Sequence, residues 1–218
     1  MSTVVRPVSV WELEPRLSEY LGMVRLLVRE GIEKRLGGMV DIRELYVNAR
    51  DVGNGFAEEI VEVALDVTGL LNLNRECVWF EGLYYSCQDG ISQNIDNYRV
   101  CDPESSEYDE EKCSREIEEC VNYHVEDFKN ENCGLPFRFV WNNETTSLAY
   151  LRPYEDEDSY KLCCGVELYY RYKQRFSLEV TRDLLSNQET MERIARYTAD
   201  KIIAEILRLV EALRALAQ

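Results

Sequence analysis

Residues 166–180 read VELYYRYKQRFSLEV, and this stretch decides the fold class. Apolar or aromatic side chains occupy every second position over most of it, at Val166, Leu168, Tyr170, Tyr172, Phe176, Leu178 and Val180. Alternation with a period of two is typical of a strand that buries one face. At about 3.3 Å per residue, the strand would span roughly 45 Å. A strand of this length is expected to bend over a helix or to pair with several partners.

Four shorter segments are predicted to complete a mostly antiparallel sheet of about five strands. Residues 57–68 alternate between apolar and polar side chains, and the aromatic-rich segment 77–86 follows after a turn. Residues 135–141 and 147–151 flank a second turn. Strands and helices that are segregated in this way predict the α+β class.

Three helices are predicted around the sheet. Residues 9–36 carry an apolar stripe at three- and four-residue spacing, and Ser9 opens a capping box. The middle helix covers 107–129, and the C-terminal helix covers 187–217 with Ser186 as its N-cap. These elements predict a single domain over 1–218, in which a cysteine-containing sheet region, 57–180, lies between the terminal helices.

The C-terminal helix has a heptad pattern of apolar residues. Its most apolar part is the seam Ile202, Ile206, Leu209, Leu213 and Leu216, which recurs at intervals of four and three. The seam fits two interpretations, because such a face packs either on the sheet of its own chain or on a neighbouring subunit. The sequence leaves both open.

All eight cysteines fall in the middle of the chain, at Cys77, Cys87, Cys101, Cys113, Cys120, Cys133, Cys163 and Cys164. We interpret them as a disulfide framework. On a helix, Cys113 and Cys120 would lie about 10 Å apart, which is too far for a bond between them. Adjacent Cys163 and Cys164 point to opposite faces of a strand and need different partners. The pairing itself stays open.

A zinc site is the alternative use of the cysteines. Cys113, Cys120 and His124 would share one helical face, and Cys101 or Cys133 could add a fourth ligand. Three ligands spread along roughly 16 Å of helix cannot contact one ion, although Cys120 and His124 alone could. We therefore expect no metal and no cofactor.

Enzyme chemistry has little support in the sequence. His124 is the single histidine, which excludes mechanisms that need a pair of them. No glycine-rich phosphate loop is present, and the many carboxylates show no spacing that distinguishes a catalytic pair. The protein is expected not to be an enzyme.

Charge and composition restrict the partners. The chain carries 25 basic and 41 acidic side chains and a net charge of -16, so we expect no nucleic acid partner. No signal peptide and no apolar segment long enough for membrane insertion are seen. Disulfides without an export signal, together with more arginine than lysine, favour the cytoplasm of a hyperthermophile or a virion.

The leading functional prediction is a non-catalytic structural or assembly protein of a hyperthermophile or its virus, forming a homo-oligomer in a virion, filament or surface structure. The alternative is a small-ligand carrier with an aromatic cavity lined by Tyr170, Tyr172, Trp79 and Tyr84. Asn143 begins an acceptor triplet for glycosylation, which matters only outside a cell.

Overall fold

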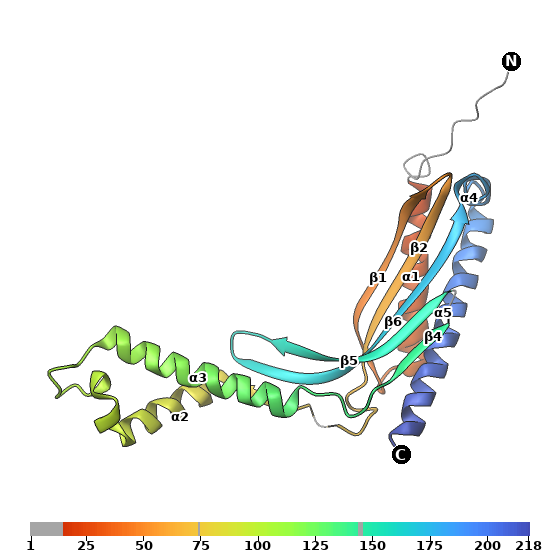
Figure 1. Cartoon of the computed structure of the whole chain (residues 1–218). Helices are drawn as coiled ribbons and strands as arrows, with labels where there is room; N and C mark the ends of the chain where they lie inside the picture. Colours follow the sequence, from red (N-terminus) through yellow and green to blue (C-terminus); the bar gives the residue numbers. More distant parts are fainter. Residues whose placement is uncertain (1–14, 74, 144–145) are drawn as a thin grey trace. The chain divides into compact units, whose positions relative to one another are not determined.

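The computed structural model describes residues 15–73, 75–143 and 146–218 (Figure 1). These residues form helices and a six-stranded sheet, which confirms the α+β class and the antiparallel sheet. The elements are α1 (Arg16–Leu36), β1 (Asp41–Gly53), β2 (Phe56–Asp66), β3 (Cys77–Trp79), α2 (Phe80–Gln93), two 3-10 turns (Ile95–Asn97 and Arg99–Cys101), α3 (Glu110–Asn132), β4 (Val140–Asn143), β5 (Ser147–Glu157), β6 (Lys161–Ser177), α4 (Leu178–Leu185) and α5 (Gln188–Leu216).

The described chain divides into two compact units. The core unit consists of residues 15–73, 137–152 and 167–218, and the cysteine unit consists of 75–136 and 153–166. The single-domain organisation stays a prediction.

In the core unit, β2 pairs with β6 in one unbroken antiparallel register. Val61 faces Tyr172, and Val63 faces Tyr170. The sheet order is β1-β2-β6-β5-β4. The long strand exists as predicted, but it begins at Lys161 and ends at Ser177. The expected strand residues Leu178 and Val180 lie in α4 instead, where burial follows a helical period: Leu178 and Leu185 are buried, and Val180 is 57% exposed.

Helices α1 and α5 lie alongside each other next to this sheet (Figure 1). The two helices approach so closely at Gly31 that a Cβ there would collide with Ile203. Ile202, Ile206, Leu209 and Leu213 are buried within the core unit, and Leu216 is 61% exposed. Most of the heptad seam therefore packs inside its own chain.

The cysteine unit has little apolar core. The buried members of the cluster between α2 and α3 are Cys87, Ile91 and Ile117. Strand β3 pairs with the first residues of β6, Cys77 opposite Cys163. The unit contains all eight cysteines, and all of them are paired in four disulfides.

The predicted strand over 77–86 is wrong beyond Trp79, because Phe80 begins α2. The aromatic side chains of this segment favour strand on local propensity alone. A helix places Cys87 and Ile91, four residues apart, on one face toward α3, and this tertiary packing overrides the local preference.

Helix starts differ from the predicted ones. The Asn187 side chain accepts a hydrogen bond from the Thr190 amide at 2.9 Å, so Asn187 and not Ser186 is the N-cap of α5. Asp109 caps α3 in the same way, with a 3.1 Å bond from the Lys112 amide. The capping box expected at Ser9 lies outside the described residues. No helix in the described part of the chain is long and apolar enough to cross a membrane.

Candidate functional site

A pocket of about 220 Å³ opens in the core unit where three helices meet the end of the sheet. Helix α4 supplies much of its wall, and α1, α5, β2 and β6 supply the rest. The lining residues are Tyr20, Glu59, Gln174, Phe176, Ser177, Val180, Thr181, Leu184, Leu185 and Ile194. Most of these side chains are apolar, and the one charged member is Glu59.

Glu59 is placed in the wall by the alternation of β2. It has the same parity as Ala57 and Val61, which are both fully buried, so its side chain points to the helix-covered face of the sheet. Only 2% of Glu59 is exposed. Its neighbour on the adjacent strand is Gln174, a second polar residue of the pocket.

One oxygen of the Glu59 carboxyl group is bonded and the other is not. The Tyr20 hydroxyl lies 3.1 Å from Oε2 and donates to it, and the same hydroxyl lies 3.2 Å from the Thr198 hydroxyl. Oε1 is buried and has no hydrogen-bond partner among the described residues. A buried carboxyl oxygen without a partner is costly unless a proton or a ligand satisfies it.

Burial raises the pKa of Glu59 from 4.5 to about 7, against a smaller opposing contribution from the Tyr20 hydrogen bond. Desolvation disfavours the charged carboxylate, and no lysine or arginine forms an ion pair with it in the described part of the chain. Near neutral pH, the group therefore changes its charge with small changes of environment.

The polar groups around Glu59 have partners of their own. The Tyr172 hydroxyl donates to Gln174, and Lys201 lies 5.2 Å from the Tyr172 ring centre. The Tyr170 hydroxyl donates to Glu205 at 2.6 Å. Burial raises the pKa of Tyr20, Tyr170 and Tyr172, so these hydroxyls stay protonated and act as donors. The unbonded Glu59 oxygen is therefore the acceptor left for an incoming group.

The α4 side of the pocket is apolar and reaches the surface. Leu178 begins α4 and its amide donates to the Gly55 carbonyl at 2.9 Å, which joins the helix to the β1–β2 turn. Leu185 is buried, whereas Val180 is 57% exposed and Leu184 41% exposed. The arrangement can hold a small apolar molecule that places one hydrogen-bond donor on Glu59.

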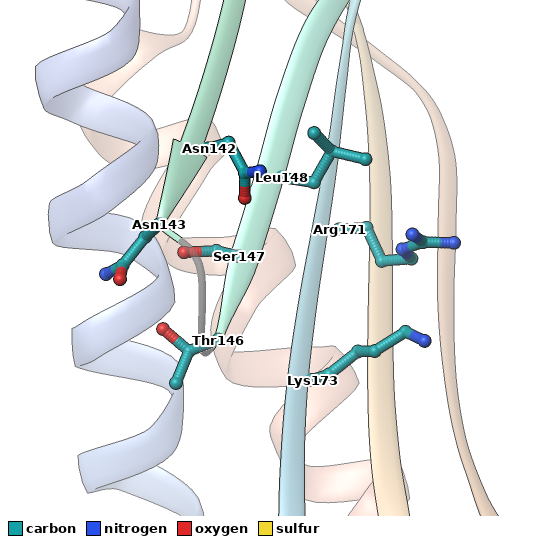
Figure 2. Close-up of a pocket in the computed structure, with 7 residues that line it drawn as sticks. All are labelled: Asn142, Asn143, Thr146, Ser147, Leu148, Arg171 and Lys173. Carbon is teal, nitrogen blue, oxygen red and sulfur yellow. The ribbon is translucent and has the colours of Figure 1, made fainter.

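A second hollow, of about 140 Å³, lies at the turn between β4 and β5 (Figure 2). Its basic side chains, Arg171 and Lys173, point away from Asn143 and Thr146. Because these polar groups diverge, the hollow offers no convergent set of contacts to a ligand. Asn143, the predicted glycosylation acceptor, lines it and is exposed, and the other two residues of its triplet lie outside the described residues.

The structure pairs the cysteines as Cys77–Cys163, Cys87–Cys120, Cys101–Cys113 and Cys133–Cys164. This confirms that Cys113 and Cys120 bond to other elements and that Cys163 and Cys164 have different partners. The bonds join α2 to α3, α3 to the second 3-10 turn, and both β3 and the end of α3 to β6. The predicted framework is present.

The four aromatic residues expected around a cavity belong to different units. Tyr170 and Tyr172 are buried in the core unit. Trp79 is 57% exposed, and Tyr84 is 41% exposed at a hollow between α2 and α3 in the cysteine unit. None of the four lines the pocket at Glu59.

Glu59 was missed by the sequence analysis, although a signal for it exists. The alternation of Val61, Val63 and Leu65 continues backward to Glu59, which lies in phase with the buried positions. A carboxylate in phase with a buried strand face is uncommon and marks a candidate site.

No family model matches this chain, and no curated protein and no solved structure matches it either. The function is therefore argued from the geometry alone.

Proposed function

We propose that the protein binds a small, mainly apolar ligand carrying a primary amine in the pocket at Glu59. The observation that carries the proposal is the buried carboxyl group of Glu59, which is 2% exposed, has an unbonded oxygen, and lies in a wall whose other side chains carry no charge. This is the ligand-carrier alternative raised by the sequence, at a different set of residues.

An amine suits the charges of the pocket. The lining contains one carboxyl group and no lysine, arginine or histidine, so a ligand carboxylate or phosphate would meet no opposite charge there. An ammonium ion would donate to the free oxygen and compensate the buried carboxylate, which is strongly destabilised alone. Phe176, Leu185 and Ile194 would contact the alkyl part. The volume of about 220 Å³ restricts the ligand to a small molecule.

Calorimetric titration with hexylamine, hexanol and hexanoate tests this proposal at pH 8. Hexylamine is expected to bind, because at this pH Glu59, with a pKa of about 7, is mostly the carboxylate that an ammonium ion needs. Glu59→Gln is expected to weaken hexylamine binding by about tenfold or more, because a charge-assisted hydrogen bond contributes about 1.5–3 kcal/mol.

The matched control is Glu58→Gln, because Glu58 directly precedes Glu59 in the same strand. Glu58 belongs to the opposite face and forms an ion pair with Arg50 at 2.6 Å, so its variant has the same charge change away from the pocket. Equal weakening in both variants would attribute the effect to net charge. Unchanged binding in Glu59→Gln, or equal binding of all three probes, would contradict the proposed site.

A second candidate function is the predicted assembly role, and one observation favours it. Six aromatic side chains in the cysteine unit are more than 40% exposed: Trp79, Tyr84, Tyr85, Tyr108, Tyr123 and Tyr160. Tyrosine and tryptophan are enriched at protein–protein interfaces. Self-association of the chain would be detected by native mass spectrometry, and Tyr84→Ser combined with Tyr85→Ser should reduce it. A chain that stays monomeric at high concentration would remove this candidate.

A further inference from the structure

Three potential metal ligands meet in the cysteine unit, at Cys87, Cys120 and His124. One ligand atom from each of these side chains lies within 4.8 Å of the other two. In the described structure the two cysteines are joined as a disulfide, whose sulfur atoms are poor ligands compared with thiolates. The group is therefore a metal site only in its reduced form.

The backbone positions suit both forms. Cys120 and His124 are four residues apart on α3 and lie on one helical face, a spacing at which two side chains contact one ion. Cys87 is on α2, and its Cα lies 6.0 Å from that of Cys120. Two thiolates on a tetrahedral ion lie roughly 3.8 Å apart, since each Zn–S bond is about 2.3 Å. A side-chain rotation can give this separation without a large movement of either helix.

We propose that reduction of the Cys87–Cys120 disulfide creates a zinc site formed by both thiolates and His124. A cellular dithiol would reduce the bond by two electrons, yielding two thiols while the dithiol itself becomes a cyclic disulfide. Zinc would then displace the two thiol protons and bind the neutral imidazole of His124. Three ligands come from the protein, and water occupies the fourth position.

The other three disulfides lack this capacity. His124 is the single histidine in the sequence, and Cys87, Cys120 and His124 are the one potential metal cluster of cysteine, histidine or carboxylate found among the described residues. Cys101–Cys113 is the closest comparison, because Cys113 lies on the same helix, about two turns before Cys120, and also contacts the small core. It supplies the matched control.

The test uses the full chain, reduced by a dithiol that is then removed without oxygen, and titrated with Co²⁺ as an optical probe for the zinc site. We expect thiolate-to-cobalt charge transfer and tetrahedral ligand-field bands in the reduced chain and neither in the oxidised chain. His124 is exposed, so the His124→Ala variant should fold normally. This variant should weaken Co²⁺ binding by about tenfold or more. The double variant Cys101→Ser, Cys113→Ser should bind like the parent.

Hydrogen exchange of the reduced chain distinguishes a built site from binding by unfolded thiols. Added Zn²⁺ should restore protection in α2 and α3, because binding to a folded site stabilises the fold. The proposal is overturned if the reduced parent shows no thiolate–cobalt band. It is equally overturned if His124→Ala binds as tightly as the parent, if the Cys101 and Cys113 variant loses the bands, or if Zn²⁺ leaves exchange unchanged.

Discussion

The core unit and the cysteine unit use different means to hold helices of similar length. Helix α5 has 29 residues and buries ten of them, whereas α3 has 23 residues and buries only Ile117. The core unit contains no cysteine, and the cysteine unit contains four disulfides. A segment that cannot bury enough apolar surface needs crosslinks, as small disulfide-rich domains do. Burial and disulfides therefore substitute for each other within one chain.

The largest expected effect comes from a cavity in the core unit. Leu213 is fully buried on α5, so Leu213→Ala should lower the free energy of unfolding by about 2–5 kcal/mol. Hydrogen exchange should rise in α1, α5 and the paired strands, while α2 and α3 keep their protection. Equal loss of protection in both units would contradict the contrast between them.

Removing a crosslink should have a comparable effect in the other unit. Cys87→Ser together with Cys120→Ser opens a bond between residues 33 positions apart, and we expect a loss of about 2–4 kcal/mol. Exchange should rise in α2 and α3 and stay unchanged in α5. The matched variant, Cys101→Ser with Cys113→Ser, removes a bond that closes a loop of only 12 positions and should cost less.

The buried carboxyl group makes the core unit sensitive to pH. Glu59 has a pKa of about 7 in the folded protein against an ordinary value of 4.5, so the folded state binds its proton more tightly. Stability from this group is complete below pH 4.5 and is lost as the pH rises through 7, by up to about 3 kcal/mol. Urea unfolding at pH 5 and pH 8 should show the loss in the parent and not in Glu59→Gln. A parent that is equally stable at both values would contradict the raised pKa.

The smallest expected effect concerns the start of α5. Asn187→Ala removes the side-chain acceptor for the Thr190 amide and should cost about 1 kcal/mol. Asn187→Asp keeps an acceptor and should cost less. The stability of both variants would be measured by thermal unfolding, followed by the loss of helical circular dichroism. If Asn187→Asp lowers the stability more than Asn187→Ala does, Asn187 does not stabilise α5 by capping it.

The sequence predicts those elements whose periodicity is long and regular. Helix α5 and strand β6 were found because burial repeats along their whole lengths, as in Ile202, Ile206 and Leu213 or Tyr170 and Tyr172. Strand β1 was not predicted, since most of its side chains are exposed and show no buried period. The sequence predicts a strand where α2 forms, because the aromatic residues of this segment favour a strand locally and its packing on α3 depends on residues outside it.

The candidate site was harder to predict than the fold. Its residues come from five elements, and Tyr20 and Thr198, which meet beside Glu59, are 178 positions apart. The period of apolar residues shows which face of one helix or strand is buried. It does not show which elements meet in the fold. Only the phase of Glu59 in β2 was accessible from the sequence. The cysteines were easier, because their chemistry predicts crosslinks even where the pairing stays open.

The division of β6 between the units has a consequence for biosynthesis. Residues 161–166 of β6 belong to the cysteine unit, and residues from 167 onward supply the rest of β6 and the long helix of the core unit. As the ribosome extends the nascent polypeptide, the last cysteine emerges before Glu167–Ser177 can pair with β2. Oxidation of the thiols can thus begin while the hydrophobic faces of α1 and β2 still await their partners, so those faces are exposed to aggregation at that stage.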